Sequence, residues 1–298
     1  MKLKIGYFAD GAWSHEAFQL LQKDEDITID FICVRYDTQD KTLKGYAKKY
    51  NIDYLKDKNI NSQEFIIKLK KYNSHLFVSM SFNQIFKTEI IHLPKYNTIN
   101  CHAGKLPFYR GRNILNWVLI NDEKEFGITV HYMDEGIDTG DIILQNTYPI
   151  HDNDNYKSLL NIAYKECASI LYKAIVLFKD GMVKGQKQKE IHPLGFYCIQ
   201  RGIGDEILNW KQTSREIFNF VRAICSPGPK ARAYLNGIEM TINKVEEIDN
   251  APTYRCIEGA ILHKDSSGIL VKTLDNFIKI TEFEYEAKYK VGDRFEIR

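Results

Sequence analysis

The sequence lacks the features that mark several large protein classes. It has no apolar run of about 18 residues and no apolar leader, so we expect neither a membrane span nor a signal peptide. Its 6 Cys form no CxxC pair or close cluster, which disfavours a disulfide framework or a Cys-based zinc site and fits a reducing cytoplasm. The charges nearly cancel, with 41 Lys and Arg against 39 Asp and Glu, so charge alone indicates no nucleic-acid partner.

What is present predicts a folded chain of one large or two ordinary domains, since 44% of its 298 residues are hydrophobic. In the first half, short β-branched or aromatic runs alternate with helical patterns, which is typical of βαβ units feeding a parallel sheet. We expect strands over residues 3–8, 27–34, 52–55, 76–80, 98–101, 127–133 and 142–145. We expect helices over residues 15–22, 43–50, 62–71, 87–93 and 155–178.

The second half changes character. The polar run 184–190 reads as the start of a linker, and we place the domain boundary near residue 203, giving domains 1–203 and 204–298. A helix over 214–224 should end at the Ser-Pro-Gly-Pro run. Strands are then expected over 233–235, 240–245, 259–263, 268–273 and 277–283, with turns at Asn236-Gly237 and near residues 265–268. We interpret this part as a small β-rich barrel.

The turn after the first expected strand argues against one common cofactor. It reads Ala-Asp-Gly-Ala-Trp-Ser, with Gly11 as its single glycine. The GxGxxG fingerprint of dinucleotide-binding proteins needs three glycines for its turn, for close approach to the pyrophosphate and for helix packing. We therefore do not expect NAD binding by that route.

Polar residues follow two of the expected strands. Asn100 and His102 leave the strand at 98–101, where open α/β sheets bind ligands, and they suit oxyanion stabilisation and proton transfer. A tight acidic loop, Asp138-Thr139-Gly140-Asp141, follows about thirty residues later. Taken singly, the histidine fits a structural hydrogen bond and the loop fits a solvated turn.

Together with their neighbours, these residues form a specific ordered set. It comprises Asn100-x-His102, Leu106-Pro107, Tyr109-Arg110-Gly111, Trp117, residues 127–133 and Asp138-Thr139-Gly140-Asp141-Ile142. The set resembles the formyltransferases that use N10-formyltetrahydrofolate, which include glycinamide ribonucleotide transformylases, methionyl-tRNA formyltransferases and nucleotide-sugar N-formyltransferases. The resemblance implies a Rossmann-like N-terminal formyltransferase domain and, at the C-terminus, a smaller OB-like barrel.

The resemblance also implies an active site made of Asn100, His102 and Asp138, with no metal. A primary amine would attack the formyl carbon through a tetrahedral intermediate that carries a negative oxygen. Asn100 can donate to that oxygen, and His102 can donate to it or accept the amine proton. Asp138 can orient and stabilise His102 or relay the proton to the leaving folate nitrogen. Which of these two carries the proton stays open.

In this family the pterin lies between two segments, here residues 80–85 and 132–137. The candidate folate-binding residues are Ser81, Phe82, Gln84, Ile85, Asp134 and Ile137. Phe82 fits a core position equally well. His131 fits either a supporting role in the site or a core hydrogen bond.

The acceptor amine separates three classes. The C-terminal domain argues against a glycinamide ribonucleotide transformylase. Residues 205–298 hold 14 Lys and Arg against 15 Asp and Glu, and the place of the basic insertion of the tRNA enzymes holds only the short segment 35–41, so tRNA binding is disfavoured. We therefore expect a nucleotide-linked amino sugar, as in the synthesis of surface polysaccharides such as O-antigen, with methionyl-tRNA as the alternative acceptor.

We expect three residues to lie where such an acceptor would bind. Arg110 and Lys105 suit a phosphate and Trp13 suits stacking on a base or sugar, although each also fits an ordinary surface or core position. Cys101, Gly104 and Lys105 differ from the more common choices in this loop, which suggests a modified acceptor pocket.

Two further possibilities come from another functional class. A non-catalytic folate binder should lack at least one of Asn100, His102 and Asp138, and all three are present. A formyltetrahydrofolate hydrolase would carry an N-terminal regulatory domain, which we do not expect ahead of the first strand. The C-terminal domain is available as a homodimer interface.

Overall fold

The computed structural model describes residues 2–297, and its internal contacts divide the chain into two compact units. The first unit comprises residues 1–111, 126–148 and 161–198, and the second comprises 112–125, 149–160 and 199–298. Because the units interleave along the sequence, the division at residue 203 stays a prediction about independently folding parts. No helix within residues 2–297 is both long and apolar enough to cross a bilayer.

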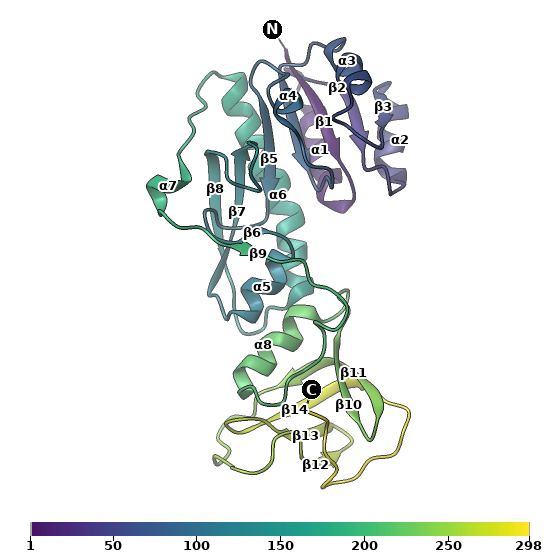
Figure 1. The fold of residues 1–298 in the computed structure, drawn as a ribbon, viewed down its shortest axis with the longest axis vertical. Coiled ribbons are helices and arrows are strands. Elements are labelled where there is room, and N and C mark those ends of the chain that lie inside the picture. The colour runs from purple at the N-terminus through teal and green to yellow at the C-terminus, as the bar shows by residue number, and fades with distance from the viewer. Residues whose placement is uncertain (1, 298) are drawn as a thin grey trace. The chain divides into compact units, whose positions relative to one another are not determined.

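A seven-stranded sheet forms the centre of the first unit (Figure 1). Its strands are β1 (Leu3–Ala9), β2 (Ile27–Val34), β3 (Asp53–Lys56), β4 (Leu76–Met80), β5 (Thr98–His102), β7 (Glu125–Tyr132) and β8 (Ile142–Pro149), in the order β3-β2-β1-β4-β5-β7-β8. The strands from β3 to β5 are parallel, which confirms the predicted parallel sheet. Strand β7 runs antiparallel to β5, because the chain turns back at the end of β5 instead of crossing over the sheet.

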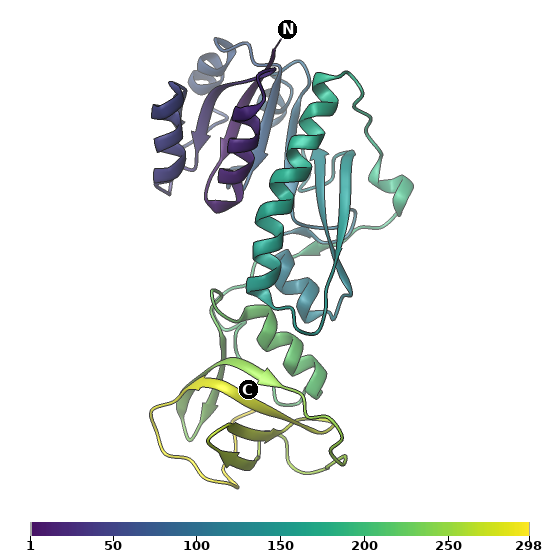
Figure 2. The same cartoon turned by 180° about the vertical axis from the view of Figure 1, so that it is seen from behind.

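Helices pack on both faces of this sheet (Figures 1 and 2). They are α1 (Ala12–Lys23), α2 (Lys41–Tyr50), α3 (Gln63–Lys70), α4 (Thr88–Ile91) and the part of α6 (Tyr156–Lys179) that belongs to this unit. Adjacent residues of β1 point to opposite faces. Tyr7 lies against Phe18 of α1, whereas Phe8 lies in a buried aromatic cluster with Phe31, Phe77 and residues of α3 and α4.

The segment 184–190, which we predicted as the start of a linker, is ordered against the first unit. Gln186 exchanges two backbone hydrogen bonds with Ile142, each of 2.8 Å, and the helix α7 (Gln188–Ile191) follows. The chain then forms a two-residue strand, β9 (Tyr197–Cys198), which pairs with β6 (Arg110–Gly111). The sequence did not predict this pairing, because polar composition does not reveal hydrogen bonds formed with distant parts of the chain.

The second unit has the expected β-rich architecture. It contains α5 (Ile114–Ile120), α8 (Ser214–Ile224), β10 (Ala231–Leu235), β11 (Ile238–Glu246), β12 (Ile261–Asp265), β13 (Gly268–Lys272) and β14 (Phe277–Glu284). The strands form one antiparallel sheet in the order β10-β11-β14-β13-β12. Asn236 and Gly237 both have positive φ, as expected for the tight turn between β10 and β11.

A segment near the end of the chain closes this sheet into a barrel. Phe295 forms a bridge with Leu235 beside the β10 edge, and Arg294 forms a bridge with Ala260 beside the β12 edge. One stretch of chain therefore satisfies backbone groups at both edges. Helix α8 begins at a capping box in which Thr213 and Glu216 exchange side-chain to backbone hydrogen bonds.

Candidate active site

Strand β5 ends with two polar side chains on one face. Asn100 and His102 are two residues apart, so both point to the same side of the strand. The antiparallel neighbour β7 places His131 directly opposite Asn100 in register. The amide Nδ2 of Asn100 lies 3.3 Å from the ring Nε2 of His131. One strand pair thus supplies three polar groups at the end of the sheet.

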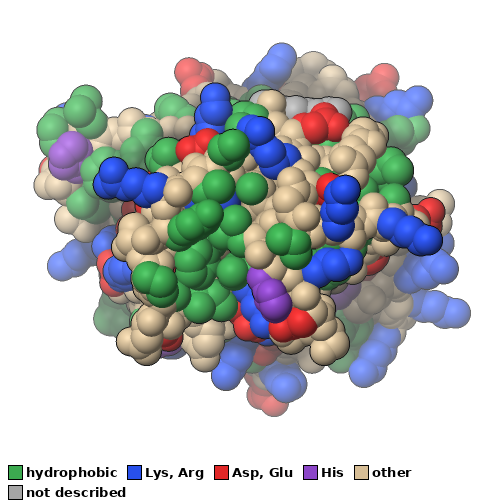
Figure 3. Space-filling view, turned by 90° about the horizontal axis from the view of Figure 1, so that it is seen from below, with side chains coloured by type: hydrophobic (Ala, Val, Ile, Leu, Met, Phe, Trp, Pro, Cys, Tyr) green, Lys and Arg blue, Asp and Glu red, His purple; other side chains and the backbone are tan. Residues whose placement is uncertain are grey.

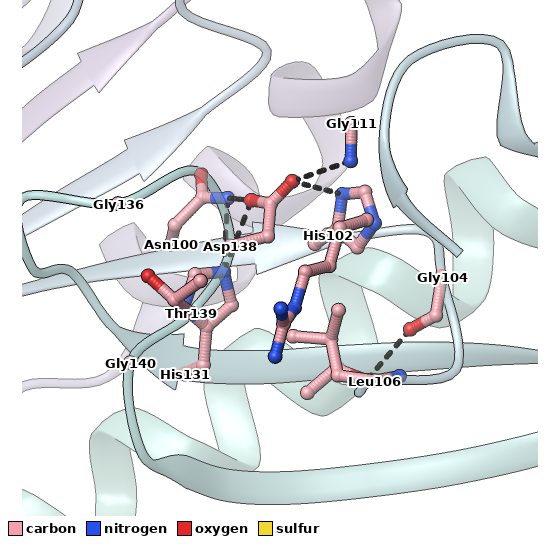
Figure 4. A network of polar contacts seen from close by, with 12 residues as sticks. Asn100, His102, Gly104, Leu106, Gly111, His131, Gly136, Asp138, Thr139 and Gly140 are labelled. Atoms are coloured by element: carbon pink, nitrogen blue, oxygen red, sulfur yellow. Dashed lines mark hydrogen bonds and ion pairs between the residues drawn. The ribbon is translucent and has the colours of Figure 1, made fainter. Parts of the chain in front are cut away.

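The loop after β7 adds a carboxylate to this group (Figure 4). Oδ2 of Asp138 lies 3.6 Å from Nδ1 of His102 and accepts the backbone N–H of Gly111 at 2.9 Å. Oδ1 lies 3.4 Å from Nε2 of His131 and 3.5 Å from Nδ2 of Asn100. The structure therefore brings together the three residues predicted as catalytic, with His131 as a fourth member.

The Asp138 carboxylate is held in its ionised form. Burial alone would raise the pKa of this carboxyl, whose side chain is only 11% exposed. When the two rings carry protons, the charge of His102, the hydrogen bond and charge of His131, and the N–H of Gly111 outweigh that effect and hold the pKa of Asp138 well below the usual range. A carboxylate with so low a pKa stabilises a neighbouring cation well and accepts a proton poorly.

The two histidine rings are each fixed by a backbone carbonyl. Nδ1 of His131 lies 2.7 Å from the carbonyl oxygen of Tyr132, and Nε2 of His102 lies 2.7 Å from that of Tyr109. Because a carbonyl only accepts hydrogen bonds, each of these nitrogens carries a hydrogen. The nitrogens that remain, Nε2 of His131 and Nδ1 of His102, both face Asp138. Either ring gains a favourable ion pair by taking up a proton there.

Gly104 leaves the space that the His102 ring occupies. A Cβ atom at position 104 would lie 2.3 Å from Nε2 of His102 and 2.3 Å from the carbonyl oxygen of Tyr109. Those two atoms form the hydrogen bond that fixes the ring. The glycine, which we noted as unusual in this loop, therefore permits the observed orientation of the histidine.

The predicted folate-binding residues before α4 play different parts. Ser81 is exposed and has a positive φ, and Ile85 is 71% exposed. Phe82 is half-buried and packs its ring against Phe8. Gln84 uses both ends of its amide within the fold, because Oε1 accepts the N–H of Ile60 and Nε2 donates to the carbonyl of Asp57.

The second predicted folate-binding segment lies beside the first. Met133 and Phe82 pack against the same buried cluster of the first unit. In the loop that follows, Oδ1 of Asp134 accepts hydrogen bonds from the N–H of Gly136 and the hydroxyl of Thr139. Asp134 thus stabilises the turn that carries Asp138, and Ile137 is 54% exposed.

The three predicted acceptor-binding residues are not gathered into one group. Trp13 lies on α1 and packs edge-to-face against Tyr164 of α6, with ring centres 4.8 Å apart. Lys105 is exposed in the loop after β5. Arg110 donates from Nε and Nη2 to Oε1 of Gln188, at 3.1 and 2.6 Å. The guanidinium therefore has a partner inside the fold.

Gln188 is the residue of this region that sequence reasoning missed. Its side chain is buried and bonds both to Arg110 and to the loop that carries Asp138. The sequence offered no signal, because Gln188 lies in a polar, charged run. Within residues 2–297, no three or more His, Cys, Asp or Glu side chains are arranged to hold a metal ion.

Comparison with known proteins identifies the family. The formyl transferase family model matches residues 23–175, and the model of the formyl transferase C-terminal domain matches residues 204–293. The methionyl-tRNA formyltransferase of Fusobacterium nucleatum is 32% identical over 250 residues, which cover 84% of this chain and 80% of the relative. The methionyl-tRNA formyltransferase of Clostridium acetobutylicum is 34% identical over 247 residues, which cover 83% of this chain and 78% of the relative.

Solved structures share the fold at lower sequence identity. The sugar 3N-formyl transferase WlaRD, solved in the presence of dTDP and 5-N-formyl-THF, aligns with a TM-score of 0.69 and 24% identity over 96% of this chain and 100% of its own. An N-formyltransferase from Helicobacter canadensis, in complex with folinic acid and dTDP-3-aminofucose, aligns with a TM-score of 0.69 and 23% sequence identity. This alignment covers 95% of this chain and 100% of the other. The chain belongs to the formyl transferase family and is a formyltransferase.

Proposed function

We propose that this formyltransferase transfers the formyl group of N10-formyltetrahydrofolate to the primary amine of a nucleotide-linked amino sugar. The observation that carries the chemistry is the ionised Asp138 carboxylate between two histidine rings and beside Asn100. These groups suit the needs of formyl transfer to an amine, which are a donor to a developing oxyanion and an acceptor for a proton.

We assign the proton to Nδ1 of His102. Nε2 of His102 already donates to the carbonyl oxygen of Tyr109, so Nδ1 is the ring nitrogen left to accept a proton. Once His102 is charged it holds the pKa of the Asp138 carboxyl low, so the proton stays on the ring. Protonation at Nδ1 forms an ion pair with Asp138. Nδ2 of Asn100 contacts both His131 and Asp138, and we assign one of its two N–H groups to the oxyanion.

The segments 80–85 and 132–137 fit a folate ring. The buried Oδ1 of Asn83 accepts no hydrogen bond from any residue between 2 and 297, so a ring N–H has an acceptor there. Ile85 and Ile137 expose apolar surface for the pterin, and backbone groups near Ser81 supply polar contacts. The bound folate would supply the formyl group, and we assign its contacts to these segments.

The charges of the second unit support a small acceptor over a tRNA. Residues 205–298 have 14 basic and 15 acidic residues, and at least five of the basic ones are paired with acids. Arg215 contacts three carboxylates, and the cations of Arg222, Lys230, Arg232 and Lys244 each pair with an acid. On the face drawn in Figure 3, basic side chains are scattered around a hydrophobic area. Phosphate binding to nucleic acid needs a surplus of accessible cations.

Methionyl-tRNA is the second candidate acceptor, favoured by the names of the relatives at 30 to 34% identity. Helix α2 carries Lys41, Lys44, Lys48 and Lys49 with no acidic residue between them, which gives a phosphate backbone a place to bind. The double variant Lys44→Glu/Lys48→Glu separates the candidates. It should leave turnover of an amino sugar unchanged and should raise KM if the acceptor is tRNA.

The deciding assay offers N10-formyltetrahydrofolate with amino sugars linked to TDP, UDP, GDP or CMP, and separately with charged initiator tRNA. We expect a formylated sugar, identified by mass spectrometry, and stoichiometric release of tetrahydrofolate. Turnover on tRNA alone would contradict the proposed acceptor. Formate release without any acceptor would indicate a hydrolase. We propose a cytoplasmic location, which the six free cysteines fit.

A further inference from the structure

We propose that Gln188 is a positioning residue that holds the loop of Asp138 in place. In this proposal Arg110 orients the side chain of Gln188 and does not bind the acceptor. This proposal rests on the role of Asp138 in the proposed function. Gln188 lies 50 residues along the chain from Asp138, on the short helix α7.

The amide of Gln188 makes four hydrogen bonds while its side chain is almost fully buried, at 4% exposure. Nε2 donates to the carbonyl oxygens of Asp138 and Gly140, both at 2.8 Å. Oε1 accepts from Nε and Nη2 of Arg110. Both N–H donors and the oxygen of the amide are thus hydrogen-bonded. The two donated bonds go to Asp138 itself and to Gly140, two residues later.

Arg110 fixes which way the amide points. A guanidinium only donates, so the oxygen of Gln188 must face Arg110 and its NH2 group must face the loop carbonyls. Arg110 is partly buried and is held by its neighbours: its guanidinium lies over the ring of Tyr197 at 5.5 Å, and its backbone N–H donates to the carbonyl of Phe196. A Cβ at Gly195 would lie 2.5 Å from the backbone carbonyl oxygen of Pro107 and 2.8 Å from the guanidinium carbon, so a glycine leaves room for this approach.

The position of the loop matters because its contacts with the histidines are long. Asp138 has a positive φ and reaches His102 and His131 at 3.6 and 3.4 Å. A loop that moves away weakens both contacts at once. A misplacement of about 1 Å in a catalytic group costs on the order of 100-fold in rate.

The test compares Gln188→Glu with Gln186→Glu. Gln188→Glu has the same shape and can still pair with Arg110, but it loses the two N–H donors to the loop. Gln186 is an exposed glutamine two residues earlier that bonds Ile142 through its backbone, so its variant is a matched control. We expect Gln188→Glu to lower kcat on the order of 100-fold with little change in folate KM, in protein that its melting curve shows to be folded at the assay temperature. Gln186→Glu should match the wild type.

A second variant separates the loss of positioning from the effect of a new charge. Gln188→Met also loses the two N–H donors to the loop but places no carboxylate beside Asp138. We expect it to lower kcat on the order of 100-fold with little change in folate KM. A kcat that falls only in proportion to the fraction of unfolded protein at the assay temperature would overturn the proposal.

Arg110→Lys tests the second half of the proposal. Lysine cannot make the two-pronged contact to Oε1, so kcat should fall while the KM for the acceptor changes by less than about threefold. A large rise in acceptor KM with kcat retained would instead make Arg110 an acceptor-binding residue. Asp138→Asn serves as the reference. If it keeps wild-type kcat, the proposed function fails; if it is inactive while Gln188→Glu is fully active, only the positioning role fails.

Discussion

His102 and Asp138 face each other, nitrogen to oxygen, at 3.6 Å, which is longer than a hydrogen bond. The other nitrogen of the ring is tightly bound to the carbonyl of Tyr109 at 2.7 Å. The hydrogen bond of Nε2 therefore fixes the ring of His102. Nδ1 faces the carboxylate of Asp138 and can accept a proton during the reaction.

Asp138→Asn should lower kcat on the order of 10³-fold, about 4 kcal/mol, because an amide keeps the shape of the side chain but cannot stabilise a charged His102. Steady-state kinetics with saturating folate measure the loss. Asp180→Asn, the same substitution at an exposed position just after α6, is the control and should keep wild-type kcat. A kcat within threefold of the wild type would rule out the electrostatic role of Asp138.

His102→Ala should remove about 2 to 4 kcal/mol of transition-state stabilisation through loss of the proton acceptor. The quantity to compare is kcat/KM for the acceptor. His92→Ala, at an exposed position after α4, removes the same kind of side chain and should have no effect. If His102→Ala kept wild-type turnover, another group would have to accept the proton.

Gly104→Ala should lower both kcat and stability, because its Cβ would enter the space between His102 and the Tyr109 carbonyl. Overpacking of this kind costs about 1 to 3 kcal/mol in unfolding free energy. Gly45→Ala is the matched control, since a Cβ at Gly45 of α2 meets no atom within 4 Å. That variant should be as active as the wild type and slightly more stable. Equal behaviour of the two variants would refute the steric argument.

Asp122 and Arg215 should give the second unit a pH-dependent contribution to stability. Hydrogen bonds from Arg215 lower the pKa of Asp122 to about 2. A carboxyl whose pKa is lower when folded stabilises the fold above its unfolded pKa of about 4, and the contribution is lost as pH falls from about 4 to 2. Partial exposure screens the pair, so we expect about 1 kcal/mol.

Urea unfolding at pH 7 and at pH 3 measures this contribution. Asp122→Asn should be less stable than the wild type at pH 7, and the difference should narrow at pH 3. Lys244→Ala, which breaks an exposed pair with Glu246, should leave the pH dependence unchanged. A constant difference between wild type and Asp122→Asn at both pH values would contradict the linkage.

Regular elements with local signals could be predicted from the sequence. Helix α8 was predicted over its observed residues, because the Ser-Pro-Gly-Pro run after it cannot continue a helix. The Asn236-Gly237 turn was predicted because its two residues tolerate positive φ. Helix α5 (Ile114–Ile120) was missed: it is short and is preceded by Asn113 without a side-chain cap.

The candidate site, like the fold, could be predicted only in part from the sequence. The gathering of Asn100, His102 and Asp138 was expected from a resemblance over an ordered motif, whereas their catalytic roles stay a proposal. The bonds of Gln84 to the loop near Ile60 were not predicted, and the role of Gln188 was not predicted either. Both depend on contacts between residues far apart in the chain, which composition and spacing do not record.

The barrel of the second unit has a consequence for how copies of this protein meet. Without residues 292–296, the N–H and carbonyl groups beside Leu235 and Ala260 would form two open sheet edges in one molecule. Open edges accept strands from other chains, and two per molecule would allow growth in both directions. The closing segment with Arg294 and Phe295 therefore protects the protein against polymerisation through its own β-sheet.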